Sequence, residues 1–268
     1  KAIQSYLHEA KKLEEIKYID EKISFKKNDT LEFEKVSFSY TDSDIPSLKN
    51  INTKINANTS VGIVGQTGAG KSTFGNLILG LFSPTSGSLK INKYIIDSKD
   101  KINSWQKNIS FVPQNLFLLE SSIKKNIAFT FDDKLIDEEK LQKSCEQAQL
   151  LDFITTLKDG YETQIGEKGM KLSGGQQQRI GIARAIYNDT NILFFDEATS
   201  ALDGVTEEKV ISSLKKNNNK TIFLISHNFA TIKNCDKILY FEKGEIAKEG
   251  TYKELMENEN FRKLSEVS

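Results

Sequence analysis

Apolar and polar positions follow two different rhythms along this chain. From residue 31 to about 61 apolar residues alternate with polar ones around a turn at 43–46, which predicts strands joined as a hairpin. Beyond residue 61, short apolar runs alternate with longer segments of helical periodicity. The predicted strands are 61–64, 109–112, 192–195, 221–226 and a pair near 237–247. The predicted helices are 70–81, 174–187 and 205–215, with several further helices within 121–155. This alternation predicts an α/β fold with a largely parallel, buried sheet.

Two stretches stand outside that alternation. Residues 1 to about 24 carry apolar side chains at helical spacing among lysines and glutamates, so they predict an amphipathic helix, and a polar linker follows it to about residue 30. The stretch at about 115–180 is mostly helical in pattern and has no strong strand signal. It is therefore predicted to be a helical subdomain inserted into a domain that spans residues 31–268.

Composition excludes several classes of protein. The 268 residues carry 37 Lys and Arg against 37 Asp and Glu, so no global field attracts the chain to nucleic acid, and no nucleic-acid partner is expected. The longest apolar runs fall far short of the roughly 20 residues that cross a bilayer. The two cysteines, Cys145 and Cys235, have no metal-ligand spacing and suit a reducing compartment.

A glycine-rich sequence connects the first predicted parallel strand to the helix that follows it. The string GQTGAGKS at 65–72 satisfies the phosphate-loop pattern in the strand–loop–helix context that the pattern requires. Glycines let backbone N–H groups face phosphates, Lys71 would pair with the β- and γ-phosphates, and Ser72 would ligate Mg²⁺. The predicted nucleotide-binding residues here are Gly65, Gln66, Thr67, Gly68, Ala69, Gly70, Lys71, Ser72 and Thr73. ATP and Mg²⁺ are therefore the expected ligands, and a mere strand-to-helix turn is the alternative.

A pair of acidic residues follows the uninterrupted apolar run at 192–195. Asp196 and Glu197 come at the carboxyl end of this predicted buried strand. Asp196 is placed to hold Mg²⁺, and Glu197 is placed to accept the proton of an attacking water. A core strand that ends in two exposed acids is the alternative interpretation.

The string LSGGQ at 172–176 distinguishes among ATPases. Ser173 followed by Gln176 is also a capping box, so the string could simply start the helix 174–187. A capping box does not require the adjacent Gly174 and Gly175, however, and glycine is costly in a first helical turn unless close backbone approach is needed. The exposed N–H groups of a helix start form an anion site.

With this string the chain resembles the nucleotide-binding domain of ABC transporters, over nearly all of residues 31–268. The resemblance implies a P-loop NTPase (RecA-like) core with a small antiparallel β-subdomain and an inserted helical subdomain. It also implies that Ser173, Gly174, Gly175 and Gln176 bind the γ-phosphate of ATP held by the opposite subunit.

The resemblance assigns roles to four further residues. Tyr40 looks like the aromatic that stacks on adenine, although a half-buried strand tyrosine is an almost equal alternative. Gln114 looks like the glutamine that contacts Mg²⁺ and the attacking water, Asp203 like the aspartate that communicates between subunits, and His227 like the histidine at the γ-phosphate. The implied catalytic set is thus Lys71, Gln114, Glu197 and His227, with Ser72, Gln114 and Asp196 at the metal.

At two positions this sequence departs from many relatives of that family. Gln177 stands where arginine often follows the signature, and Asn228 follows His227 where arginine is frequent. Neither position supplies the chemistry, so an intact site is still expected.

The segment GEKG at 166–169 resembles the loop by which exporter-type domains contact the membrane part. The implied protein is the motor of an exporter or flippase, working as a head-to-tail pair with a second copy or a homologous ATPase domain. A transmembrane domain upstream of Lys1 in the same polypeptide would be its partner, at the cytoplasmic face of the inner (plasma) membrane. A soluble ATPase acting on ribosomes or DNA, and a regulatory module without turnover, are the alternatives. Strings such as LLESSIKKNIAF and RIGIARAIY look most like flippases of lipid-linked oligosaccharides or polysaccharides, with lipid, peptide and drug exporters as close alternatives. The substrate itself is bound by the membrane part.

Overall fold

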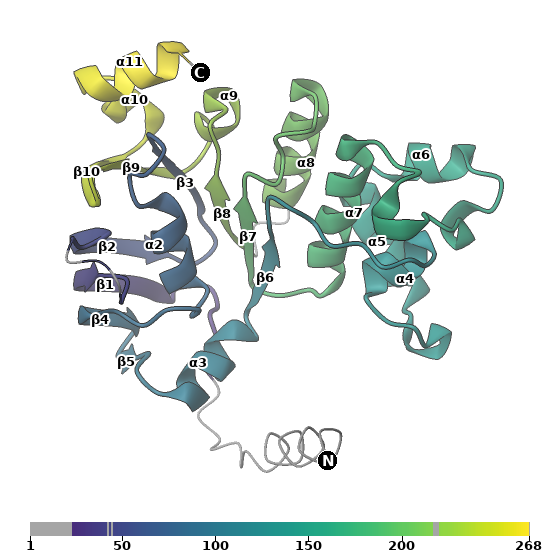
Figure 1. The fold of residues 1–268 in the computed structure, drawn as a ribbon, viewed down its shortest axis with the longest axis horizontal. Coiled ribbons are helices and arrows are strands. Elements are labelled where there is room, and N and C mark those ends of the chain that lie inside the picture. The colour runs from purple at the N-terminus through teal and green to yellow at the C-terminus, as the bar shows by residue number, and fades with distance from the viewer. Residues whose placement is uncertain (1–22, 42, 44, 217–219, 268) are drawn as a thin grey trace.

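The structure is a computed structural model that describes residues 23–41, 43, 45–216 and 220–267 (Figure 1). The amphipathic helix predicted over residues 1 to about 24 lies almost wholly outside the described residues. Within them, no helix combines the length and the apolar character needed to cross a membrane.

A six-stranded sheet forms the centre of the fold (Figure 1). Its strands run in the order β10-β9-β3-β8-β7-β6, and all neighbours pair in parallel except β10 with β9. Every residue of β3 and β8 is buried, as the continuous apolar runs predicted. The strands are β3 (Ser60–Gly65), β6 (Ile109–Val112), β7 (Ile192–Asp196), β8 (Thr221–Ile225), β9 (Lys237–Glu242) and β10 (Glu245–Gly250).

Two hydrophobic cores lie on the two faces of this sheet, because successive side chains of a strand point to opposite faces. In β7, Leu193 and Phe195 belong to the core beneath the C-terminal and inserted helices, whereas Ile192 and Phe194 belong to the core beneath α2 and the antiparallel strands. The helices that flank the sheet are α2 (Lys71–Ile78), α7 (Gly174–Tyr187), α8 (Gly204–Lys216), α9 (Phe229–Ile232), α10 (Tyr252–Leu255) and α11 (Glu259–Val267).

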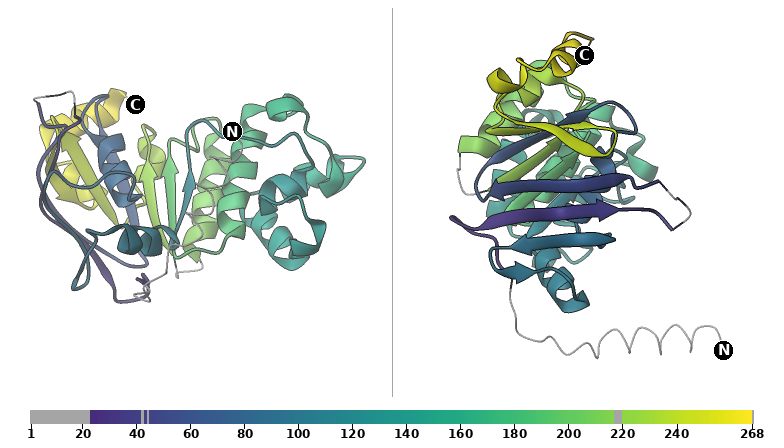
Figure 2. Two further views of the ribbon diagram at one scale, coloured as in Figure 1. Left: turned by 60° about the horizontal axis from the view of Figure 1, so that its bottom comes forward. Right: turned by 90° about the vertical axis from the view of Figure 1, so that its left-hand side faces the viewer.

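A four-stranded antiparallel sheet covers one side of α2, and its strands cross the right-hand view of Figure 2 in purple and blue. Its order is β2-β1-β4-β5, with β1 (Thr30–Phe38), β2 (Leu48–Asn56), β4 (Ser86–Ile91) and β5 (Tyr94–Ile95). The β1–β2 hairpin confirms the predicted one. The sequence pattern does not indicate β4, β5 or the helix α3 (Lys99–Gln106), which docks through Trp105 Nε1, a donor to Ile78 O at 2.6 Å.

Helices fill the stretch between β6 and β7, as predicted, and they gather at the end of the molecule opposite the antiparallel sheet (Figure 1). Besides α7 they are α4 (Ile123–Ala128), α5 (Glu138–Gln147) and α6 (Leu151–Thr156), with single 3-10 turns at Asp133–Leu135, Gly160–Glu162 and Glu167–Gly169. The fold is thus a mixed α/β fold in which the parallel sheet, the antiparallel β-subdomain and the helical insertion all appear. The boundaries of the predicted subdomains stay a prediction.

Candidate functional site

The phosphate loop joins the end of β3 to the start of α2. Three of its glycines have positive φ angles, of 152° at Gly65, 79° at Gly68 and 105° at Gly70. A Cβ at Gly65 would lie 2.4 Å from Phe241 O, so only glycine fits there. At Gly68 a Cβ would meet nothing within 4 Å, which leaves the crest of the loop open to a ligand.

The first turn of α2 is uncapped. Its N-cap residue, Gly70, is left-handed and makes no side-chain cap hydrogen bond, and the first turn carries no acidic residue. Ser72 lies exposed in this turn. Free N–H groups and the positive end of the helix dipole therefore coincide, which is the arrangement that binds phosphate.

Lys71 is buried under this loop, and its ammonium points back into it. The Nζ atom donates to Gly65 O at 2.7 Å and to Gln66 O at 3.1 Å. Burial lowers the pKa of Lys71, and the nearby carboxylates of Glu197 and Asp196 oppose that shift. The positive charge is therefore held at the place where phosphate oxygens would arrive.

The end of β7 delivers two acids to the same region. Burial raises the pKa of Asp196, Glu197 raises it further, and Lys71 opposes both effects. Glu197 has a left-handed backbone with φ 50°, and its N–H donates to Ile225 O at 2.9 Å. Such a conformation costs a non-glycine residue about 1–3 kcal/mol and is concentrated at functional sites.

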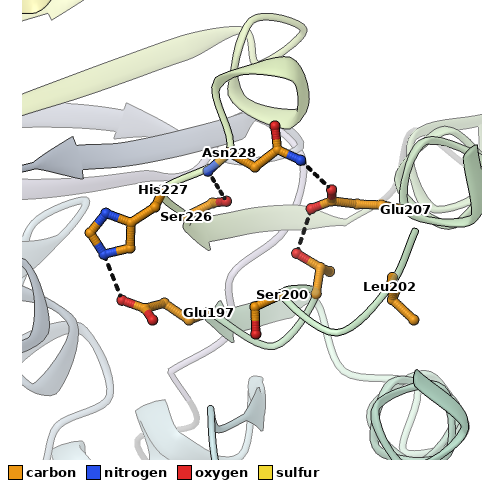
Figure 3. Close-up of a pocket in the computed structure, with 8 residues that line it drawn as sticks. Glu197, Ser200, Leu202, Glu207, Ser226, His227 and Asn228 are labelled. Carbon is orange, nitrogen blue, oxygen red and sulfur yellow. Dashed lines mark hydrogen bonds and ion pairs between the residues drawn. The ribbon is translucent and has the colours of Figure 1, made fainter. Parts of the chain in front are cut away.

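Two loops converge on the carboxylate of Glu197. Gln114 Nε2, from the loop after β6, donates to Glu197 Oε2 at 2.9 Å. His227 Nε2, from the loop after β8, lies 3.0 Å from Glu197 Oε1 (Figure 3). The residues predicted as catalytic, Lys71, Gln114, Glu197 and His227, are therefore brought together at the carboxyl edge of the parallel strands.

The signature string begins α7, and the capping box is present. Ser173 Oγ accepts from Gln176 N at 3.3 Å, and Gln176 Oε1 accepts from Ser173 N at 2.8 Å. Gly175 also has the structural reason that the sequence argument required, because a Cβ there would lie 3.0 Å from Ala201 O, whereas a Cβ at Gly174 would meet only Ala201 Cβ at 3.4 Å. The capping box is therefore confirmed, and the anion site at this helix start stays a prediction.

One side chain ties the signature helix to the loop after Glu197. Gln178 Nε2 donates to Ser200 Oγ at 3.2 Å, and Gln178 Oε1 accepts from Ala201 N at 2.8 Å. In the same loop Asp203 Oδ1 accepts from Thr206 N at 3.0 Å, so it caps the start of α8, and this hydrogen bonding lowers the pKa of Asp203. Gln177, the first departure from the family pattern, holds Gly169 O through Nε2 at 3.1 Å.

Tyr40 lies beside the phosphate-loop helix in an aromatic cluster. Its hydroxyl is 3.0 Å from Thr73 Oγ1, and its ring packs edge-on against Phe38 and Phe82. With 42% of its surface exposed, Tyr40 retains a face for a ligand. Its assignment to adenine remains a prediction.

The two predicted halves of the nucleotide site do not meet within this chain. Among the described residues, no hydrogen bond or ion pair joins the segment 65–72 to the segment 173–176. The sheet order explains the separation, since β8, β7 and β6 lie between β3 and the helical region that α7 faces.

The donor set suits Mg²⁺ that arrives with a nucleotide. No group of three His, Cys, Asp or Glu side chains that could hold a metal occurs among the described residues. Mg²⁺ keeps several waters and is commonly bound by one or two carboxylates together with substrate phosphates. Ser72, Gln114 and Asp196 at the mouth of the phosphate loop fit that requirement.

Sequence reasoning missed one buried acid of the site. Glu207, on α8, is 3% exposed and contacts Thr199 and Asn228, which line the same pocket as Glu197 and His227 (Figure 3). A signal was present, because Glu207 precedes the buried Val210, Ile211 and Leu214 at the helical spacing of three, four and seven residues. An acid on the apolar stripe of a helix marks a position that needs a polar partner.

Comparison with known proteins bears on this geometry. A model of the ABC transporter family matches residues 48–200. The chain belongs to the ABC transporter family. Family membership confirms the prediction from the motifs that this is an ABC transporter ATP-binding domain.

Individual relatives agree with this assignment. An ATP-dependent lipid A-core flippase of Wigglesworthia glossinidia brevipalpis is 41% identical over 228 residues, which are 85% of this chain and 39% of that protein. A leukotoxin translocation ATP-binding protein of Mannheimia haemolytica is 39% identical over 231 residues, 86% of this chain and 32% of that protein. The chain therefore spans about two fifths or less of the length of these relatives.

A solved structure gives the same result for the fold. The structure of a bacterial Atm1-family ABC exporter with ATP bound matches with a TM-score of 0.82 at 32% sequence identity. The match covers 91% of this chain and 42% of that one.

Proposed function

We propose that this ABC-family domain hydrolyses ATP and thereby drives a transporter that exports or flips its substrate across a membrane. The observation that carries the proposal is the carboxylate of Glu197, held by Gln114 and His227 beside the buried ammonium of Lys71. A general base needs this kind of fixed position, and a developing charge on phosphate needs a nearby cation.

In the proposed reaction, water attacks the γ-phosphorus, its proton passes to Glu197, and the bond from the γ-phosphorus to the bridging oxygen of ADP breaks. Gln114 and His227 hold the Glu197 carboxylate by its two oxygens, so its orientation is fixed before substrate arrives. Lys71 and the N–H groups of the first turn of α2 bind the phosphates. Mg²⁺, held by Ser72, Asp196 and Gln114, would neutralise phosphate charge when bound.

A second ATPase domain is part of the proposal. The exposed start of α7, at Ser173 and Gly174, would complete the site formed by the phosphate loop of the other copy. Two ATP molecules would lie at the interface of a head-to-tail pair, formed by two copies or by one copy and a homologous domain. ATP would close the pair, and hydrolysis would open it.

Exposed apolar side chains support a membrane-domain partner. Phe117, Phe131, Leu135 and Met170 are each 63–76% exposed, and all four come from the helical region or the loop at 166–170. Exposed apolar side chains contributed by one subdomain are candidates for contact with a protein partner. The proposed location is therefore the cytoplasmic face of the inner (plasma) membrane, against a transmembrane domain whose coupling segments contact Glu167 and the helical region. A lipid-linked saccharide is the proposed class of substrate.

Replacement of Glu197 by Gln tests the hydrolytic role. In the native protein that carries this chain, Glu197→Gln replaces the carboxylate by an amide that still forms hydrogen bonds but cannot act as a base. ATP binding is therefore expected to persist while turnover falls by roughly 100-fold or more. Glu139→Gln, a change of the same chemistry on the exposed face of α5, is the control and leaves turnover unaltered. Hydrolysis at the wild-type rate in the Glu197→Gln protein would refute the proposal.

A further inference from the structure

Glu207 is a buried carboxylate whose partners are uncharged. Its side chain is 3% exposed, and among the described residues no lysine, arginine or histidine forms an ion pair with it. A buried acid without an opposite charge normally costs stability compared with a neutral isostere. Packing of α8 alone therefore does not explain why an acid occupies this position.

The two oxygens of Glu207 bind two different loops. Oε1 accepts from Thr199 Oγ1 at 2.6 Å, and Oε2 accepts from Asn228 Nδ2 at 2.7 Å. Thr199 lies two residues after Glu197, and Asn228 follows His227 directly. One carboxylate on α8 thus links the loop that carries the proposed base to the loop that carries its histidine partner (Figure 3).

The orientation of Asn228 is fixed by a second contact. Asn228 Oδ1 accepts from Ala230 N at 2.9 Å, where it caps the short helix α9. Because the carbonyl oxygen is occupied by that cap, the amide nitrogen must face Glu207. Glu207 therefore supplies the acceptor and Asn228 the donor. The hydrogen bond requires an NH group at position 228 and an oxygen at position 207.

We propose that Glu207 is a positioning residue, which through Thr199 and Asn228 sets the spacing of Glu197 and His227 at the moment of reaction. The proposal rests on the proposed hydrolytic function. It assigns the link to a residue outside every predicted motif, and to Asn228, a position at which the sequence departs from many relatives. A misplacement of a reacting group by about 1 Å lowers rates by about 100-fold, so a link of this kind affects turnover without touching the substrate.

Asn228→Asp in the native protein tests this link. Aspartate keeps the oxygen that caps α9, but it puts a second carboxylate against Glu207 in place of the donor. We expect kcat to fall about tenfold while the KM for ATP stays within about twofold, because the phosphate loop is untouched. A general loss of folding would instead change the active fraction and the unfolding temperature together.

The second variant exchanges donor and acceptor. In the double variant Asn228→Asp, Glu207→Gln, the amide nitrogen of the introduced glutamine can donate to the introduced aspartate, while the amide oxygen still accepts from Thr199. The double variant should recover kcat to within about threefold of the wild type, a rescue that reads out the pairing itself.

Thr199→Val is the check if Asn228→Asp fails to fold. It removes only the hydroxyl on the other side of Glu207 and should lower kcat at an unchanged KM. A wild-type kcat in folded Asn228→Asp or Thr199→Val protein, or a double variant no faster than Asn228→Asp, overturns the inference. Failure of the proposed function has a different signature, namely wild-type protein without hydrolysis or Glu197→Gln protein with full hydrolysis.

Discussion

The phosphate loop and the Ser173 signature both place glycines at the start of a helix, but they treat the backbone of that helix in opposite ways. At α2 the N-cap is left-handed Gly70 without a side-chain cap, and the N–H groups of the first turn are left for a ligand. At α7 Ser173 and Gln176 cap each other in a complete box. The first helix start has no side chain that caps its N–H groups, whereas the second supplies its own cap.

The surroundings of the two helix starts also differ: charged side chains lie at the start of α2, whereas the start of α7 is exposed. Lys71 is buried beneath the phosphate loop, and the carboxylates of Glu197 and Asp196 interact electrostatically with its ammonium. Ser173 and Gly174 are exposed, and the signature is tied instead to the loop at Ser200 and Ala201 through Gln178. The comparison teaches that similar glycine patterns can suit different ends: under the proposed function, the first binds phosphate within the chain and the second presents a helix start to another molecule.

Lys71→Ala is expected to have the largest effect, and it tests whether the start of α2 binds phosphate. Loss of the ammonium should weaken ATP binding and lower turnover, together by roughly 100-fold or more. Titration of the native protein with a fluorescent ATP analogue and a phosphate-release assay measure the two effects. Lys90→Ala, which removes an exposed partner of Glu34, should change neither; equal effects of the two variants would contradict the role of Lys71.

Gly174→Glu should separate the two helix starts. An acid in a first turn favours the helix, so folding is kept, but the new carboxylate repels phosphate from a second molecule. We expect turnover to fall at least about tenfold while ATP affinity at the chain's own phosphate loop stays within about twofold. Lys99→Glu, at the first position of the Ser98-capped helix α3, is the matched control and keeps full turnover. Wild-type turnover in the Gly174→Glu protein would mean that the signature only caps α7 and has no role at a second molecule's phosphate.

Ser173→Ala is expected to have the smallest effect of the three variants, and a second capping box in the same fold provides its control. Thr251 and Glu254 form a second capping box at the start of α10. Ser173→Ala and Thr251→Ala should each lower the free energy of unfolding by about 1 kcal/mol, measured by urea denaturation. Only Ser173→Ala should also lower the rate of hydrolysis, and parallel losses of rate in both variants would argue against a role beyond capping.

Features with a local signature were predictable from the sequence. The phosphate loop, the acidic end of β7 and the start of α7 each occupy a few consecutive residues, and the structure places all three at the predicted element ends. The apolar runs of β3, β7 and β8 identified the parallel sheet, because strands buried on both faces need no alternation.

Features that depend on distant contacts were not predictable. In β4 only Leu89 and Ile91 are buried, so its pattern is too short to distinguish from a loop, and pairing with β1 stabilises it. Glu207 is defined by Thr199 and Asn228, the latter 21 residues away, and no spacing rule links the two. The proposed encounter of Ser173 with a phosphate loop would likewise be a contact between molecules.

Mixing two inactive proteins tests the composite site most directly. Lys71→Ala protein retains the signature, and Gly174→Glu protein retains the phosphate loop, so a mixed pair contains one intact site. Equimolar mixing of the two proteins before reassembly should restore phosphate release to a clear fraction of the wild-type rate, while each variant alone stays near background. No recovery at any mixing ratio, with mixed pairs shown to form by pull-down of differently tagged copies, would contradict a site shared between two molecules.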